Sequence, residues 1–480
     1  MKILATLAPL FISLCSLAQG GYKIDFKVKG LKDTTVLLGY YTGENTFVRD
    51  TARANGQGLF SFDGKERLPQ GVYFLAINKM KTFDFIISAQ QHFSMETSTE
   101  DYVRHMKVKG DEDNELFFGD MMFIAERHKE AGPFIKVIQD STLKEDQKKE
   151  ARESFQLINE KVMTHQDGII SKYPTTLTAR MMKATRPIDV PNPPTKPDGS
   201  IDSTFQLRYY RQHYFDNFDI ADDALMRLPK PLYTEKLGEY LDKLFLQTPD
   251  SIMAAIDNLA ARVKKNTETY KFLVWNCVYK YQKPTIMGLD EVYVRLVDKY
   301  YLSGEMDFWI DASLKKNLKD YADKLRVSLI GKTGANLSMQ DQNFQQKSLY
   351  DIKKKYTVLY IFDPDCGHCR EESPKLVDFY NKNKVRFNLE VFAVNADSSM
   401  QKMRDYIKEM KMTWITVNGP RSYVGSYSKL YYAETTPSLY VLDDKKKIIA
   451  KGIPAEKLED FLTHYELFQQ RKATIKRKGT

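Results

Sequence analysis

The sequence predicts a multidomain protein with an N-terminal all-β sandwich-like domain, a central all-α domain and a C-terminal α/β domain. Three observations lead to this prediction. The chain has 480 residues, and one hydrophobic core rarely serves more than about 250–300 residues. Apolar residues alternate with period two near the start and follow helical spacing in the middle. Toward the end, buried-strand runs and helical runs take turns, which is typical of an α/β domain.

Residues 19–110 are predicted to form the β-sandwich-like domain. From Tyr22 to Val28, apolar and charged side chains alternate, as in a strand with one buried face. The other short apolar runs are Val36–Tyr41, Leu59–Phe62, Val72–Ile77, Phe83–Ile87 and Phe93–Met95. Turn signals such as Asn55-Gly56 separate these runs, and many short strands at this spacing favour a sandwich or barrel.

Residues 111–325 are predicted to be helical, because apolar side chains recur at helical spacing, as at Ile252, Ile256, Leu259 and Val263. A proline-rich stretch from Arg186 to Gly199 interrupts the pattern. We interpret it as an ordered crossover loop, with a partner-docking strip as the alternative. Cys277 shares a helical face with apolar residues, which is typical of a buried structural thiol.

Residues 326–480 are predicted to form the α/β domain. A fully apolar strand at Tyr356–Phe362 is followed by a helix. The other elements expected are a strand at Phe387–Val394, a helix at Met400–Met412, a short strand at Trp414–Val417, a hairpin of Ser438–Leu442 with Lys447–Lys451, and a closing helix at Ala455–Phe468. This β-α-β-α-β-β-α order indicates a mixed central sheet between helices.

The composition is that of a folded soluble chain, with 42% hydrophobic and 28% charged residues. The net charge is +9, but Lys2 and five basic residues after Gln470 supply six of these charges. The rest of the chain is nearly balanced and has no basic stripe with interleaved aromatic residues. We therefore expect no nucleic-acid partner.

Residues 1–18 have the pattern of a secretory signal peptide. Lys2 precedes an apolar run that ends at Leu17, and Ser16 and Ala18 supply small residues at the −3 and −1 positions of a cleavage site. The run is shorter than the roughly 20 residues that span a bilayer. We expect cleavage to remove this segment, together with Cys15, and to leave the mature protein in the envelope.

The strongest chemical signal is a pair of cysteines, Cys366 and Cys369, at a predicted strand-to-helix junction. A helix N-terminus lowers the pKa of a thiol, so Cys366 is predicted to attack and Cys369, one turn further on, to resolve. His368 between them is expected to stabilise the thiolate, and Gly367 with His368 to tune the redox potential. A zinc site would need further ligands that this region lacks. We expect neither a metal nor a cofactor.

These residues carry a resemblance to a known family. Cys366-Gly-His-Cys-Arg-Glu-Glu-Ser-Pro374, Val394-Asn-Ala-Asp397 and Thr435-Thr-Pro-Ser438 resemble motifs of the TlpA/ResA-like envelope thiol–disulfide oxidoreductases, which have the thioredoxin fold. The resemblance extends from about Lys332 to Gln469. Segments of the first two domains also resemble uncharacterised β and helical domains found on Bacteroidetes envelope thioredoxins.

The resemblance implies roles for further residues. A cis peptide bond between Thr436 and Pro437 would lie against the cysteines and bind an extended substrate. Glu372 would accept a proton near the thiols or modulate their pKa. Three positions depart from the family pattern: Asp365 replaces a tryptophan and should oppose thiolate formation, Tyr360 replaces the buried aspartate of thioredoxins, and the Gly-His dipeptide resembles that of protein disulfide isomerases.

The sequence thus predicts a periplasmic thiol–disulfide oxidoreductase, with membrane association left open. Its expected partners are thiols and disulfides of envelope proteins and an upstream membrane thiol electron donor. The direction of electron flow and the oligomeric state are not predicted. A non-catalytic envelope scaffold is the alternative. A peroxiredoxin-like peroxidase is less favoured, because Asp363 stands where that site carries threonine.

Overall fold

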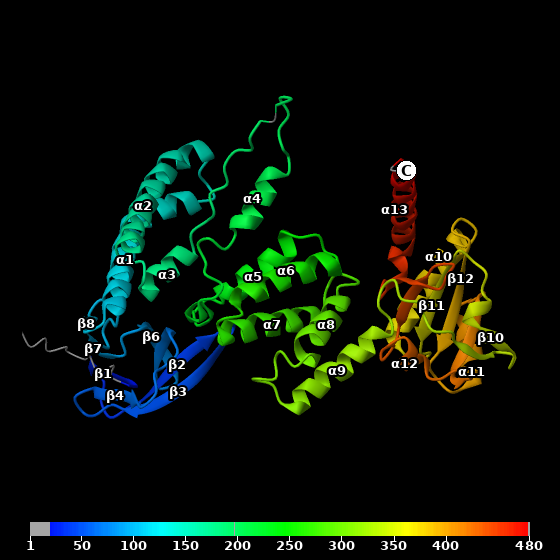
Figure 1. The fold of residues 1–480 in the computed structure, drawn as a ribbon, viewed down its shortest axis with the longest axis horizontal. Helices are drawn as coiled ribbons and strands as arrows, with labels where there is room; N and C mark the ends of the chain where they lie inside the picture. The colour runs from blue at the N-terminus through cyan, green and yellow to red at the C-terminus, as the bar shows by residue number, and fades with distance from the viewer. Residues whose placement is uncertain (1–19, 196, 479–480) are drawn as a thin grey trace, which may run out of the picture. The chain divides into compact units, whose positions relative to one another are not determined.

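The computed structural model describes residues 20–195 and 197–478 (Figure 1). The predicted signal peptide, residues 1–18, lies outside the described residues. The chain forms two compact units. The first runs up to Leu244 and includes Arg262–Tyr270, and the second combines Phe245–Ala261 with the chain from Lys271 onward. This division falls within the predicted helical region, and the predicted domain boundaries stay predictions.

The first unit begins with two four-stranded sheets around one core. Their strand orders are β4-β1-β7-β8 and β3-β2-β5-β6. The strands are β1 (Tyr22–Lys29), β2 (Thr35–Thr42), β3 (Asn45–Arg53), β4 (Leu59–Gly64), β5 (Gly71–Ile77), β6 (Met80–Ile87), β7 (His92–Ser98) and β8 (Lys107–Lys109). Every second residue of β1 is buried, and Phe26 shares the core with Leu38 and Phe85 from the other sheet. The predicted sandwich-like arrangement is confirmed.

The helices of the first unit follow the sheets. They are α1 (Glu112–Gln139), α2 (Glu145–Lys172), α3 (Leu177–Ala184), α4 (Phe205–His213), the short 3₁₀ helix η1 (Asp223–Met226) and α5 (Leu232–Lys243). The long helices α1 and α2 lie side by side (Figure 1). The proline-rich stretch is part of an irregular connection between α3 and α4, in which Thr195 bridges to Ile201.

The second unit contains a helical segment and an α/β segment. The helices are α6 (Pro249–Val263), α7 (Thr267–Gln282), α8 (Asp290–Leu296), its π-helical continuation η2 (Val297–Leu302) and α9 (Ala312–Arg326). The last residues of α6 and the first residues of α7 belong to the first unit. Cys277 on α7 is fully buried.

A seven-stranded mixed sheet forms the centre of the α/β segment, in the order β10-β9-β13-β12-β11-β14-β15. The strands are β9 (Ser338–Asp341), β10 (Gln346–Ser348), β11 (Tyr356–Phe362), β12 (Leu389–Asn395), β13 (Ile415–Ser422), β14 (Ser438–Leu442) and β15 (Ile448–Lys451). β11 pairs parallel with β12 and antiparallel with β14. Because β11 is an inner strand, its carboxyl end and the cysteine motif that follows it lie near the middle of the sheet.

Helices cover both faces of this sheet. They are the 3₁₀ helix η3 (Leu349–Asp351), α10 (Gly367–Asn383), α11 (Met400–Glu409), α12 (Tyr427–Leu430), the 3₁₀ helix η4 (Ala455–Lys457) and α13 (Leu458–Lys478). All seven residues of β11 are buried. Val358 packs in one core with Leu376 of α10, whereas Leu359 packs in a second core with Val417 of β13. Such two-sided burial accounts for the uninterrupted apolar run.

Alternation and helical spacing do not predict every element. Most residues of β3 are exposed, so this strand lacks the apolar alternation that marks the others. β9 and β10 are short, and α13 continues past Phe468 with mainly polar residues. In the part of the chain that the structure describes, we find no helix with the length and apolar character needed to cross a membrane.

Candidate active site

The cysteine motif lies where the central strand passes into a helix. β11 ends at Phe362, three residues form a turn, and Cys366 is the N-cap of α10. The Sγ atom of Cys366 accepts a hydrogen bond from the backbone N–H of Cys369 at 3.3 Å. Backbone N–H groups in the first turn of a helix have no partner within the helix, so an anion at this position is stabilised.

The two thiols differ in exposure. Cys366 is partly exposed, whereas Cys369 is fully buried. The Sγ atom of Cys369 receives the backbone N–H of Asp363 at 3.5 Å. Cys366 is therefore the more accessible of the two thiols.

The two thiols also differ in acidity. Burial disfavours the thiolate of Cys366, but hydrogen bonds from the Cys369 thiol and from the backbone N–H groups of Cys369 and His368 outweigh this effect, so the pKa of Cys366 lies below its ordinary value. Burial raises the pKa of Cys369 to about 12. Since the thiolate is the nucleophile, Cys366 is the thiol prepared for attack.

The predicted substrate-binding residues lie against the reactive thiol. The Thr436–Pro437 peptide bond is cis, as the resemblance implied. The thiol of Cys366 donates to the carbonyl oxygen of Thr436 at 3.4 Å. Thr436 and Pro437 are both partly exposed, so a polypeptide bound to Cys366 would pass over them. Their binding role stays a prediction.

The predicted tuning residues lie on the exposed side of the motif. Gly367 is exposed, and the side chain of His368 is 86% exposed, with Nδ1 at 3.8 Å from the carboxylate of Glu371. The backbone N–H of His368 contributes to lowering the pKa of the Cys366 thiol. An effect of the imidazole on the thiolate stays a prediction.

The carboxylate of Glu372 contacts η4. One carboxylate oxygen accepts the backbone N–H of Ala455, and the other lies 3.7 Å from the Nζ atom of Lys375. These contacts tie α10 to η4. The predicted role of Glu372 in proton transfer is not part of these contacts and stays a prediction.

Comparison with known proteins adds to this geometry. Residues 330–451 match the AhpC/TSA family. A 115-residue stretch is 30% identical to tryparedoxin of Trypanosoma brucei brucei and covers 24% of this chain and 78% of that protein. The chain belongs to the thioredoxin-fold thiol–disulfide oxidoreductases. The predicted family and enzyme class are thereby confirmed.

Other family models and solved structures also match the oxidoreductase. Residues 22–117 match one domain of unknown function (DUF4369), and residues 146–324 match another (DUF5106). Among solved structures, a domain of a possible thiol-disulfide isomerase from Cytophaga hutchinsonii is 38% identical over 30% of this chain and 97% of that one, with a TM-score of 0.28. A thioredoxin-like protein from Bacteroides caccae is 18% identical over 58% and 99%, with a TM-score of 0.39.

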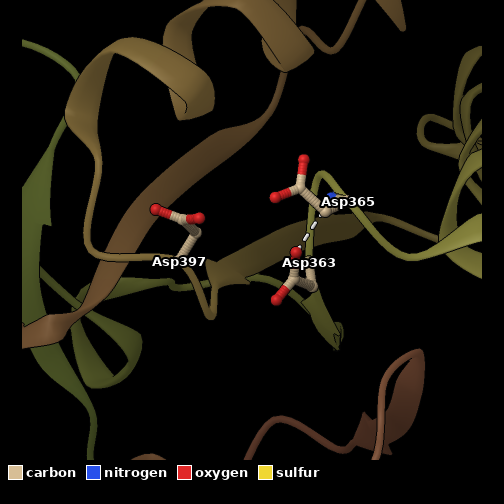
Figure 2. A group of neighbouring side chains, drawn as sticks. All are labelled: Asp363, Asp365 and Asp397. Atoms are coloured by element: carbon tan, nitrogen blue, oxygen red, sulfur yellow. Dashed lines mark hydrogen bonds between the residues drawn. The ribbon is translucent and has the colours of Figure 1, made fainter.

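The oxidoreductase carries an ionic group beside its thiols that the sequence does not predict. Asp363 and Asp365 follow β11, and Asp397 follows the parallel neighbour β12, so their carboxyl groups gather within 4.8 Å of one another (Figure 2). The Nζ atom of Lys402 on α11 lies 2.6 Å from Asp365 and 2.9 Å from Asp397. The negative charge that Asp365 places next to Cys366 is therefore offset by Lys402, which also pairs with Asp397.

A chain of buried hydroxyl groups lies behind Cys369 in the oxidoreductase. The hydroxyl of Tyr360 donates to the backbone carbonyl of Cys369 at 3.4 Å and contacts Ser373 Oγ at 2.9 Å, and Ser373 contacts the hydroxyl of Tyr406 at 2.9 Å. Burial raises the pKa of both tyrosines. A neutral hydrogen-bonded network that includes Tyr360 thus stands where the resemblance to thioredoxins would place a buried aspartate.

Proposed function

We propose that the protein is a periplasmic thiol–disulfide oxidoreductase that exchanges disulfides with envelope proteins through Cys366 and Cys369. The N-cap position of Cys366, where its Sγ accepts the backbone N–H of Cys369, together with the full burial of Cys369, carries the thiol chemistry of this proposal. A cleavable signal peptide at residues 1–18, predicted from the sequence, supports the compartment. An upstream thiol protein of the membrane is the proposed electron donor.

The exchange is a two-step reaction. The Cys366 thiolate attacks one sulfur of the client's disulfide, which forms a mixed disulfide and releases the other client sulfur as a thiolate. Cys369 then loses its proton, and its thiolate attacks Cys366 Sγ. The client leaves as a dithiol, and the Cys366–Cys369 disulfide holds the two oxidising equivalents. With an oxidised enzyme and a reduced client, the same steps run in reverse.

The burial of Cys369 determines when the second step can begin. A pKa of about 12 keeps this thiol protonated while Cys366 is free. Glu372 is proposed to receive the proton once the mixed disulfide forms. Thr436 and Pro437 are proposed to hold the client backbone, because the carbonyl of Thr436 already contacts the Cys366 thiol.

Substitution of each cysteine tests the proposal. Cys366→Ser should abolish insulin reduction by dithiothreitol-recycled protein, whereas Cys369→Ser should form a mixed disulfide with a client and fail to release it. Cys277→Ala is the matched control, since this thiol is fully buried and burial raises its pKa to about 12. Turnover by the Cys366→Ser variant that equals the wild type would contradict the assignment.

Two further measurements separate the alternatives. A reduction potential near that of thioredoxin, about −270 mV, would indicate a reductase, and one near that of DsbA, about −120 mV, an oxidase. A cysteine pair that stays in one redox state throughout the titration would support the scaffold. Peroxide consumption, assayed beside disulfide exchange, would support the peroxidase if it were the faster of the two reactions.

A further inference from the structure

A cavity of about 440 Å³ opens beside the cis-proline turn, within the second unit. One side is formed by the turn and β14, including Thr435, Pro437 and Ser438. The other side is formed by the α7–α8 connection, Lys283–Gly288, and by Tyr321 on α9. Thus a segment outside the residues that match the thioredoxin-fold family contributes one wall of a cavity next to the cis-proline turn.

Several contacts fix this wall to the α/β segment. The backbone N–H of Lys451 lies 3.1 Å from the Sδ atom of Met287, and the ammonium group of Lys451 forms a largely buried ion pair with Asp290 at the start of α8. On the other flank, the ring of Tyr321 meets the edge of the Tyr432 ring at 6.1 Å between centroids. The wall is therefore held at both flanks of the cavity.

The helical wall offers apolar surface to solvent. Ile286 and Met287 line the cavity, yet their side chains remain 43% and 42% exposed. Pro284 on the same connection and Pro437 opposite add further apolar surface. The volume lies within the range of about 300–1,000 Å³ that is usual for ligand clefts.

The reaction itself brings a polypeptide to this place. In a disulfide the two Cα atoms are about 4.4–6.8 Å apart, so a client cysteine bonded to Cys366 lies next to Thr436, whose carbonyl is 3.4 Å from the Cys366 thiol. Both neighbours of Thr436 in the chain line the cavity. An extended chain advances about 3.3–3.6 Å per residue, so client residues two to four positions from the cysteine reach the cavity.

We propose that this cavity selects clients by receiving a large apolar side chain two to four residues from the cysteine that pairs with Cys366. The inference rests on the proposed function, since the client arrives through the mixed disulfide. The substrate class is then an extended segment in which leucine, methionine or phenylalanine stands near the reacting cysteine. Ile286 and Met287 determine this specificity and take no part in the sulfur chemistry.

Matched peptide substrates test the proposal on the full chain. Each peptide carries one cysteine as a mixed disulfide with 5-thio-2-nitrobenzoate and has either phenylalanine or serine at one position, two to four residues from the cysteine on either side. Attack by reduced protein on the peptide sulfur releases the coloured thiol. At the best position, the phenylalanine peptide should react about tenfold faster than the serine peptide, the equivalent of about 1.4 kcal/mol.

Variants test which residues cause the preference for the phenylalanine peptide. Ile286→Ser should reduce the phenylalanine-to-serine rate ratio to about twofold, and Ile286→Leu should preserve it. Thr285→Trp, which places bulk at the exposed rim of the cavity, should also reduce the ratio. Val385→Ser is the matched control, because Val385 is 85% exposed and does not line the cavity.

The outcomes distinguish this inference from the function on which it rests. Reduction of a small disulfide, 5,5′-dithiobis(2-nitrobenzoate), reports the thiol chemistry and should be the same in all these variants. Equal rates for the two peptides at every position, with normal reduction of the small disulfide, would overturn the cavity's role and leave the redox function standing. A ratio that persists in both Ile286→Ser and Thr285→Trp would also overturn it. No reaction with either substrate class would refute the redox function itself.

Discussion

Two cysteines of one short motif acquire opposite properties because their surroundings differ. Cys366 is the N-cap of α10, where backbone N–H groups and the thiol of Cys369 stabilise its anion. Cys369 is one turn further along and fully buried, and the cost of burying a charge keeps it protonated. The order of attack and resolution that we propose for the two thiols rests on these positions in the fold.

Removal of the Cys369 thiol should weaken the acidity of Cys366. In the variant Cys369→Ala, Cys366 loses the hydrogen bond that contributes most to lowering its pKa, so its pKa should rise. Alkylation by iodoacetamide proceeds through the thiolate, and its rate should therefore increase with pH over a higher range than in the wild type. The measurement is the pH profile of the alkylation rate, followed by mass spectrometry of the peptide that contains Cys366.

Two comparisons make this result decisive. In wild-type protein the midpoint of the profile should lie below about 8.5, the pKa of an unperturbed thiol. The profile of Cys366 should be unchanged in Cys277→Ala. A midpoint in Cys369→Ala at or below the wild-type value would show that the Cys369 thiol does not lower the pKa of Cys366.

The residues of the candidate site differ in how far the sequence reveals them. Cys366, Cys369 and the Thr436-Pro437 turn belong to short motifs, so they can be read from the chain. Lys402 pairs with Asp365 although 36 residues separate them along the chain, and the Tyr360–Ser373–Tyr406 contacts join β11, α10 and α11. No local pattern encodes such contacts, because they depend on how the elements pack.

At the scale of elements, the sequence pattern predicts those strands of which one face or both faces are buried. β1 shows its alternation and β11 its uninterrupted apolar run, because burial selects those side chains. β3 is an edge strand with mostly exposed residues, so backbone pairing with β2 defines it and side-chain pattern does not. β10 is likewise an edge strand without buried residues, whereas the inner strand β9 is mostly buried but only four residues long, too short to show a periodic pattern.

One buried amide on α1 binds the backbone of the neighbouring β-sheet. Asn114, near the start of α1, is fully buried; its Oδ1 accepts the backbone N–H of Ile86 at 2.7 Å, and its Nδ2 donates to the carbonyl of Ile86 at 2.8 Å. Ile86 lies in β6, an edge strand. The side chain of Asn114 thus takes the place of the missing neighbouring strand.

Substitution of Asn114 by alanine should destabilise the first unit. The change leaves the N–H and C=O groups of Ile86 buried without partners, and each unsatisfied group costs about 1–3 kcal/mol, so the free energy of unfolding should fall by about 2–6 kcal/mol. Urea unfolding followed by circular dichroism measures this change. Glu115→Ala, on the next and exposed position of α1, is the control and should change stability by less than about 0.5 kcal/mol. A similar small effect of Asn114→Ala would contradict the bridging role.

For the whole molecule, the residues around the two thiols and the wall proposed to select clients come from different parts of the chain. Cys366, Cys369, Lys402 and Thr436 all lie within residues 330–451, the part that matches the thioredoxin-fold family. The two cores on either side of the sheet are likewise built from residues after position 329. The α7–α8 connection, by contrast, contributes to the cavity and to none of the contacts of the two thiols.

A fragment of residues 326–480, which starts at the predicted domain boundary, should therefore fold and retain its redox potential. Because the hydrogen bonds that set the two thiol pKa values stay within the fragment, its potential should differ from that of the full chain by less than about 30 mV, a tenfold change in the equilibrium constant. Equilibration with glutathione buffers measures both potentials. The fragment should reduce the small disulfide at the rate of the full chain, but it should not distinguish phenylalanine from serine peptides, since the wall with Ile286 is absent. A fragment that keeps this distinction would place the selective surface in the thioredoxin fold itself, and a larger change in potential would make the helical segment part of the redox site.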